Sequence, residues 1–129
     1  MAFIEKSAVL TGRCKGSIWN MRMRQPRFGG PASVDFDWKW VLEREEKYRD
    51  ILGFFHTHPP GMATPSQRDV RTMRAWVSCM GKPMLCVIEC DANLNAFVFE
   101  TDEDDGFPFA EVQRFPRNVL IGVKNRHAP

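Results

Sequence analysis

Four polar residues within one short segment could carry out chemistry together. His56 and His58 are separated by a single residue, and Ser66 and Asp69 follow a loop that is rich in proline. Residues 53–58 are predicted to form a strand, on which residues two apart point to the same face. Both imidazoles would therefore lie on one side. Two imidazoles and one carboxylate suit a zinc ion, and three protein ligands leave a fourth position for water, as in catalytic sites.

Ser66 and Asp69 also have a purely structural interpretation. The pattern Ser-x-x-Asp is an acidic variant of the capping box that starts a helix, and on its own this interpretation is favoured. A single His-x-His pair is likewise usually not a metal site. The two signals joined by one loop are much more specific than either alone. We therefore predict that His56, His58 and Asp69 bind zinc and that Ser66 also caps a helix.

Composition and charge narrow the protein classes. A length of 129 residues favours one domain over residues 1–129. The net charge of +2 is too small to predict a nucleic-acid partner. No apolar stretch predicts a membrane span, and the N-terminus lacks a signal-peptide core, so a cytoplasmic protein is expected. In one local basic run, a solvated sheet face is favoured over a binding patch. That run comprises Arg13, Lys15, Arg22, Arg24 and Arg27.

The four cysteines, at positions 14, 79, 86 and 90, are expected to be reduced thiols. We interpret them as small, buried apolar side chains. The sequence contains no Cys-x-x-Cys pair, which argues against a second, structural zinc site.

The first half of the chain is predicted to form a hairpin, a helix and a strand. The hairpin strands cover residues 2–13, ended by Gly12, and 17–24, with a turn at 14–16 and a loop over 25–32. The helix would be capped by Ser33 or Asp35 and run to about Asp50. The strand over 51–58 carries the histidines.

The second half begins with a helix over 66–80, in which Val70, Met73, Val77 and Met80 form one apolar face and Gly81 provides the stop. The remaining predicted segments are strands over 83–90 and 94–100 with a turn at 91–93, an acidic loop over 101–106, and short strands over 109–113 and 119–123. This order predicts an α/β fold of the α+β sandwich type: a mixed, largely antiparallel sheet flanked by two helices, one on each side.

The segment His56-x-His58-Pro59, followed by six residues and Ser66-x-x-Asp69, resembles the signature of the JAMM/MPN-plus metalloproteases. The stretch from Glu5 to Gly12 fits the family's upstream glutamate and glycine. The order of elements also resembles the family's JAB/MPN fold, which is cytidine-deaminase-like. The resemblance implies that His56, His58 and Asp69 bind Zn2+, that Glu5 is the general base and then the acid, and that Ser66 stabilises the oxyanion.

The alternative to a catalytic role for Glu5 is that it is simply an exposed strand residue near the N-terminus. Its rivals for the role of base are Glu43, Glu45 and Glu46, which are predicted to lie on the solvated side of a helix. We favour Glu5.

The resemblance also implies a substrate. Active family members commonly cleave a peptide or isopeptide bond after the C-terminal glycines of ubiquitin or a ubiquitin-like protein, and the small size here resembles prokaryotic members. Deconjugation and precursor processing both remain open. The acidic loop at 102–105 could meet an arginine in a substrate tail, although a solvated loop is favoured.

The sequence leaves two other functions open. The loop Pro59–Ser66 also resembles RadC-like proteins, which are associated with DNA processes, but the Glu5 register and the absence of a basic domain argue against them. A catalytically silent MPN scaffold subunit is disfavoured because such domains usually lose ligands, whereas this chain has them all.

Overall fold

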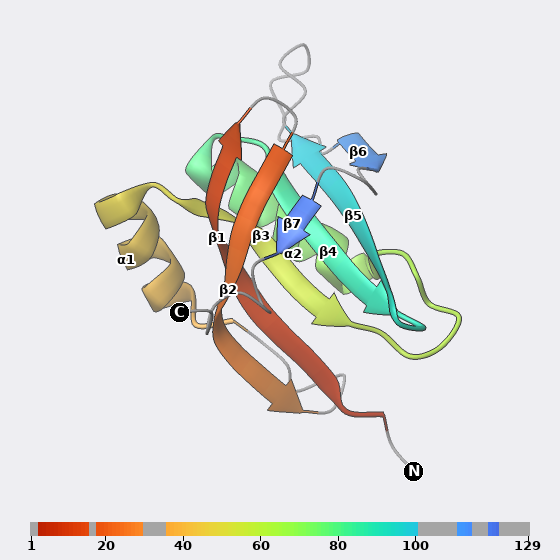
Figure 1. The fold of residues 1–129 in the computed structure, drawn as a ribbon. Coiled ribbons are helices and arrows are strands. Elements are labelled where there is room, and N and C mark those ends of the chain that lie inside the picture. Colours follow the sequence, from red (N-terminus) through yellow and green to blue (C-terminus); the bar gives the residue numbers. More distant parts are fainter. Residues whose placement is uncertain (1–2, 16–17, 30–35, 101–110, 115–118, 122–129) are drawn as a thin grey trace.

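The computed structural model describes residues 3–15, 18–29, 36–100, 111–114 and 119–121. Seven strands of these residues form one mixed sheet in the order β6-β5-β4-β3-β1-β2-β7 (Figure 1). The β3/β4 and β2/β7 pairs are parallel and the other pairs are antiparallel, which confirms a largely antiparallel sheet. The strands are β1 (Glu5–Lys15), β2 (Ile18–Gly29), β3 (Ile51–Thr57), β4 (Met84–Cys90), β5 (Asn93–Glu100), β6 (Glu111–Arg114) and β7 (Val119–Ile121). The helices are α1 (Trp38–Tyr48) and α2 (Gln67–Met80).

The β1–β2 hairpin is longer than the sequence predicts. β1 does not end at Gly12 but continues to Lys15, so the predicted turn at 14–16 is wrong for Cys14 and Lys15. Gly12 is required for close approach instead, since a Cβ atom there would lie 2.0 Å from the carbonyl oxygen of Asn20. Its N–H also donates to the carbonyl oxygen of Asp50 (2.9 Å), which ties the hairpin to the start of β3.

β2 continues through part of the predicted loop, to Gly29. The pairing passes from Ser7↔Arg27 to Val9↔Arg24, so that Gln25 and Pro26 face a single residue of β1. This is a β-bulge, and Gln25 has a positive φ of 51°. The bulge accommodates a proline that lacks an N–H for the ladder. Pro26 therefore does mark an interruption of regular pairing, but the interruption is a bulge within a strand and not a loop.

β4 and β5 are joined by the tight turn that the sequence predicts. Asp91 and Ala92 both have positive φ values, of 52° and 64°, and separate the paired residues Cys90 and Asn93. Two such residues are typical of a type I′ hairpin. This hairpin extends the sheet beyond β3, whose other neighbour is β1.

Both helices have recognisable caps, but α1 begins later than predicted. Its N-cap is Asp37, not Ser33 or Asp35, and the Asp37 carboxylate accepts the Trp40 N–H at 3.0 Å. It ends at Tyr48 because Arg49 adopts a left-handed conformation. α2 confirms the prediction, with Ser66 as N-cap and Gly81 as C-cap.

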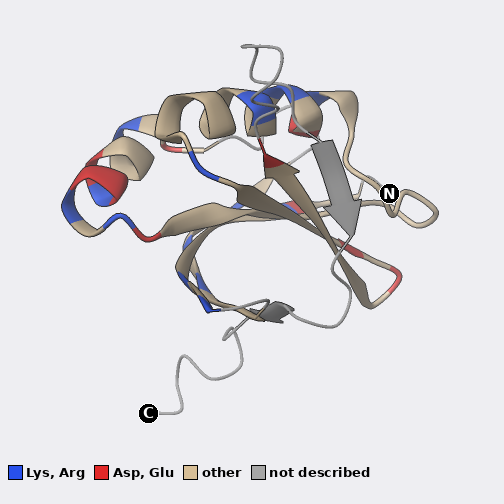
Figure 2. Cartoon of the chain, turned by 90° about the horizontal axis from the view of Figure 1, so that it is seen from above, with Lys and Arg blue, Asp and Glu red and all other residues tan. Residues whose placement is uncertain are grey.

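The two helices lie on the same face of the sheet, so the predicted helix on each side is wrong (Figure 2). Val41 of α1 and Trp76 of α2 belong to one core cluster with Phe54 of β3. The opposite face has its own cluster, to which only strand residues contribute among the described part of the chain, including Leu10 and Phe55. Apolar periodicity identifies the buried side of a helix but not which face of the sheet it covers.

Three further predictions concern the rest of the chain. The acidic loop at 101–106 lies outside the described residues. All four cysteines are free, but Cys14 and Cys79 are exposed, so the prediction that all four are buried is wrong for these two. No described helix has the length and apolar character needed to cross a membrane.

Candidate metal centre

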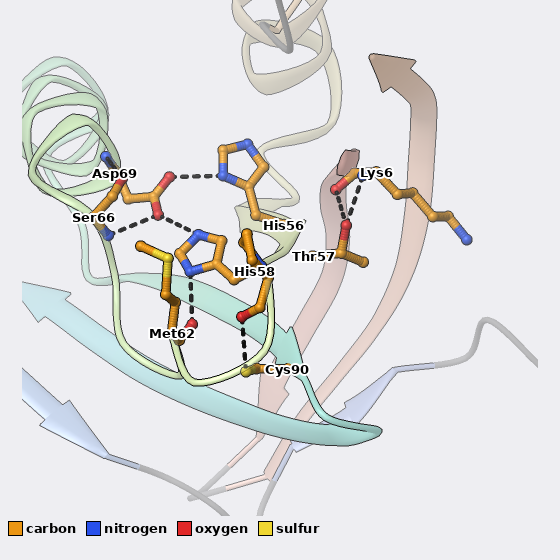
Figure 3. A network of polar contacts seen from close by, with 9 residues as sticks. Lys6, His56, Thr57, His58, Met62, Ser66, Asp69 and Cys90 are labelled. Carbon is orange, nitrogen blue, oxygen red and sulfur yellow. Dashed lines mark hydrogen bonds and ion pairs between the residues drawn. The ribbon is translucent and has the colours of Figure 1, made fainter. Parts of the chain in front are cut away.

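Side chains from β1, β3, the following loop and α2 line one cavity of about 310 Å³. All five predicted site residues are in its lining, namely Glu5, His56, His58, Ser66 and Asp69. Ligand atoms of His56, His58 and Asp69 lie within 4.8 Å of one another. Figure 3 shows the Asp69 carboxylate between the two imidazole rings. The structure therefore brings together residues that are up to 64 positions apart in the sequence.

His56 lies on the helix-covered face of β3. Its Nδ1 is 2.7 Å from Oδ1 of Asp69, and its ring stacks on Phe36 with centroids 5.2 Å apart and planes 9° apart. Its Nε2 is buried and has no hydrogen-bond partner among the described atoms. Burying an imidazole with one unsatisfied nitrogen is costly. Packing alone therefore explains this histidine poorly.

His58 follows the end of β3 and is held by two contacts. Its Nδ1 lies 3.0 Å from the carbonyl oxygen of Met62, and its Nε2 lies 3.0 Å from Oδ2 of Asp69. A carbonyl oxygen can only accept, so the hydrogen is on Nδ1. In the neutral ring, Nε2 then presents a lone pair to the carboxylate. The backbone contact fixes the tautomer that a metal ligand needs.

Asp69 is almost completely buried, at 2% exposure, and is the hub of the site. Its Oδ2 accepts the Ser66 N–H at 2.9 Å, while Ser66 Oγ accepts the Asp69 N–H at 3.0 Å. This reciprocal capping box holds the carboxylate at the start of α2. Burial alone would raise the pKa of Asp69, but hydrogen bonds from His56 and His58 outweigh it and hold that pKa well below its usual range.

The donor set fits a metal cation. A lone pair on His58 Nε2 and an ionised carboxylate oxygen repel each other at 3.0 Å unless a proton or a cation lies between them. Burial lowers the pKa of His58, yet its hydrogen bond with Asp69 holds that pKa above the ordinary value, so a proton is favoured when no metal is bound. Two imidazoles and one carboxylate with room for a further ligand match catalytic zinc sites.

Glu5 reaches this cavity through pairing between β1 and β3. Ser7 is opposite His56 in this antiparallel pair, so Glu5 is level with His58. The Lys6 N–H donates to Thr57 Oγ1 at 2.7 Å and secures the two strands at this end (Figure 3). Glu5 is buried, which rules out the alternative of an exposed strand residue. The cavity lining does not include the alternative carboxylates on α1, which are Glu43, Glu45 and Glu46.

Sequence reasoning missed the residues that support the candidate ligands. Phe36 packs against His56, and the Met62 carbonyl orients His58. The Asp91 carboxylate accepts the Gly61 N–H at 3.2 Å and thereby anchors the loop between the ligands. A positive φ of 84° at Gly61 forms the turn that presents Met62. The Pro-Pro-Gly run could have signalled this turn, but a backbone carbonyl leaves no signature in a sequence.

Comparison with known families identifies one match. The model described as prokaryotic homologs of the JAB domain matches residues 4–100, from just before Glu5 to the end of β5. A comparison with curated proteins gave no significant match. The matched region contains every described residue of the cavity lining.

Proposed function

The chain belongs to the family of prokaryotic JAB-domain homologues, and from this premise we propose that it is a zinc-dependent peptidase or isopeptidase. Its proposed substrate is a ubiquitin-like protein, cleaved after its C-terminal glycines during deconjugation or precursor processing. One observation supports this most strongly. A buried carboxylate from a separate strand, Glu5, shares a cavity with three clustered donor residues.

The roles of the residues follow from their chemistry. His56, His58 and Asp69 would hold the zinc ion. When bound, zinc would lower the pKa of water to about 7 and polarise the scissile carbonyl. Glu5 would accept a proton from the attacking water and return it to the leaving amine. Burial beside the ligands would keep bulk water from competing for that proton.

Ser66 would contribute a hydrogen bond to the developing oxyanion. Its Oγ already accepts the Asp69 N–H at 3.0 Å, but a hydroxyl also has one hydrogen to donate. The cap thus fixes the position of the oxygen and leaves its donor available. A preorganised donor of this kind accelerates acyl transfer by roughly 10²–10³-fold.

The choice of substrate rests on the family and on the size of the cavity. A Gly-Gly tail carries no side chains, so an extended tail could enter a cavity of about 310 Å³ and bring its carbonyl next to the ligands. A scaffold subunit without catalytic activity would gain nothing from burying an imidazole lone pair beside an ionised carboxylate. The presence of the complete donor set with Glu5 favours catalysis.

The proposal is tested by metal analysis and a fusion reporter. Protein purified without metal and then refilled should contain about one zinc per chain. It should cleave a fluorescent protein fused behind the Gly-Gly tail of a ubiquitin-like protein, and a Gly-Gly→Ala-Pro tail serves as the matched control. Failure to bind zinc, or DNA binding without any cleavage across a panel of such reporters, would overturn the proposal.

A further inference from the structure

We propose that the β1–β2 hairpin carries a docking site for an acidic segment of a protein partner, separate from the metal centre. The site consists of four arginines on the helix-side face of the hairpin. We call it the arginine face, and it comprises Arg13, Arg22, Arg24 and Arg27. It lies in the region for which composition alone favoured a solvated surface.

Strand register gathers these arginines on one face. Arg22 is opposite Thr11, Arg24 opposite Val9 and Arg27 opposite Ser7. Val9 packs in the core beneath the helices, so its cross-strand partner Arg24 lies on the same side of the sheet. The bulge at 25–26 keeps Arg27 in phase with Arg24 although they are three residues apart. Without that bulge, Arg27 would point to the opposite face.

The arginine face is concave beside α1. Arg13, Arg22 and Arg24 line a cavity of about 320 Å³ together with Thr11, Asn20 and the Arg44–Asp50 pair. Asp50 is already held by Arg44 through two hydrogen bonds of 2.9 and 2.7 Å. No other carboxylate from the described part of the chain lines the cavity. An incoming anion would therefore contact three guanidinium groups. The described carboxylate that could compete for them, Asp50, is already paired with Arg44.

Arg24 has a buried nitrogen, Nε, that lacks an acceptor in the described part of the chain. The other three arginines likewise have no ion pair with a described residue. A buried guanidinium nitrogen without an acceptor is costly, so a small movement of Arg24 toward a carboxylate in the cavity would gain a charge-assisted hydrogen bond.

The modest charge of the chain favours an acidic peptide over a nucleic acid as the ligand. Guanidinium groups bind carboxylates and phosphates alike, and Thr11 and Asn20 add neutral hydrogen-bonding groups to the same cavity. The chain has a net charge of only +2, which provides little long-range attraction for a polyphosphate. A short run of Asp or Glu residues fits both the size and the sign of the site.

The location suggests how docking would serve catalysis, and this part rests on the proposed function. Arg27 is opposite Ser7, two residues from Glu5, so the arginine face leads from the α1 cavity toward the metal centre. A target protein with an acidic segment beside the scissile bond would be held along β2. The arginine face would then select among conjugates that share the same Gly-Gly tail.

Binding is tested with a fluorescein-labelled eight-residue Asp/Glu peptide by anisotropy, at low and at physiological salt. Arg22→Glu with Arg24→Glu should weaken binding about tenfold or more, because two charge-assisted contacts are lost. The matched control, Lys39→Glu with Arg74→Glu, makes the same charge change on exposed helix positions and should bind like the parent protein. Circular dichroism verifies folding, and Arg22→Gln with Arg24→Gln replaces the first pair if it does not fold.

Equal weakening by both pairs of substitutions, or no binding at all, would overturn the proposal. Tighter binding of single-stranded DNA of the same length would replace the protein partner by a nucleic acid. The parent protein should cleave a reporter with an acidic segment after the scissile bond faster than a counterpart with Asn and Gln in that segment. The Arg22→Glu/Arg24→Glu variant should cleave the two reporters at the same rate. Peptide binding without cleavage of any reporter would leave the docking site standing and refute the peptidase.

Discussion

The β3–α2 segment and the β1–β2 hairpin contribute to the same cavity in different ways. The first supplies His56, His58 and Asp69 from 14 consecutive residues, held by a short loop and a helix cap. The second supplies Glu5 only through its pairing with β3. The candidate metal ligands therefore come from one local segment, whereas the position of the proposed base depends on long-range strand register. Changes in the two regions should have separable effects.

The largest effect should come from removing a ligand. His58→Ala should lower zinc affinity by more than the roughly 10–100-fold lost with an outer-shell partner, and reporter cleavage should fall to background. Competition with a chromogenic chelator measures the affinity. The matched control is His127→Ala, which removes the one histidine outside the segment. Parent-like zinc affinity in His58→Ala would refute the ligand assignment.

The hairpin is tested by Glu5→Gln, which should retain zinc but reduce the reporter cleavage rate by roughly 10²–10⁴-fold, because the amide cannot accept the proton. Glu46→Gln on the exposed side of α1 is the control and should be neutral. Unchanged cleavage with bound zinc would mean that the base lies elsewhere. Loss of zinc in Glu5→Gln would instead show that the two regions are not separable.

Ser66→Ala should have an intermediate effect on rate and a small one on stability. The cleavage rate should fall by roughly 10²–10³-fold, and the free energy of unfolding should fall by about 1 kcal/mol through loss of the cap. Asp37→Ala removes the cap of α1 and should lower stability similarly without changing the rate per bound zinc. If the two variants lose activity equally, Ser66 acts only as a cap.

The smallest expected effect concerns a cysteine of the hairpin and a cysteine of β4, the strand that pairs with β3. Cys14 at the end of the hairpin is exposed, whereas Cys86 is buried opposite Phe54 of β3. Burial raises the pKa of the Cys86 thiol well above its ordinary value. The neutral thiol stabilises the folded protein at pH values below its ordinary pKa. This contribution to the free energy of unfolding is lost as the pH rises toward the raised pKa.

Native alkylation at pH 8 with mass spectrometry should therefore modify Cys14 and Cys79 but spare Cys86, and unfolding in urea should expose all of them. Rapid modification of Cys86 in the folded protein would show that the β3–β4 pairing opens readily.

The sequence predicted the local half of the site well because its signals are short-range. Strand alternation places His56 and His58 on one side, and Ser66 begins α2. Long-range features were harder to predict. Pro26 suggested a loop but lies in a bulge, and the helices were assigned to opposite faces because periodicity carries no information about which face is covered. Glu5 was identified only through a family resemblance, since pairing register is set by tertiary packing.

The double use of Asp69 has an evolutionary consequence. Its carboxylate faces both imidazoles and also completes the capping box of α2. Loss of either histidine leaves the helix cap intact, while loss of Asp69 weakens the fold as well. In a lineage released from selection for activity, the histidines should drift first and the Ser-x-x-Asp pair should persist. Under the proposed function, a relative that retains only this pair would be the descendant of a metal-binding ancestor and not the bearer of a different chemistry.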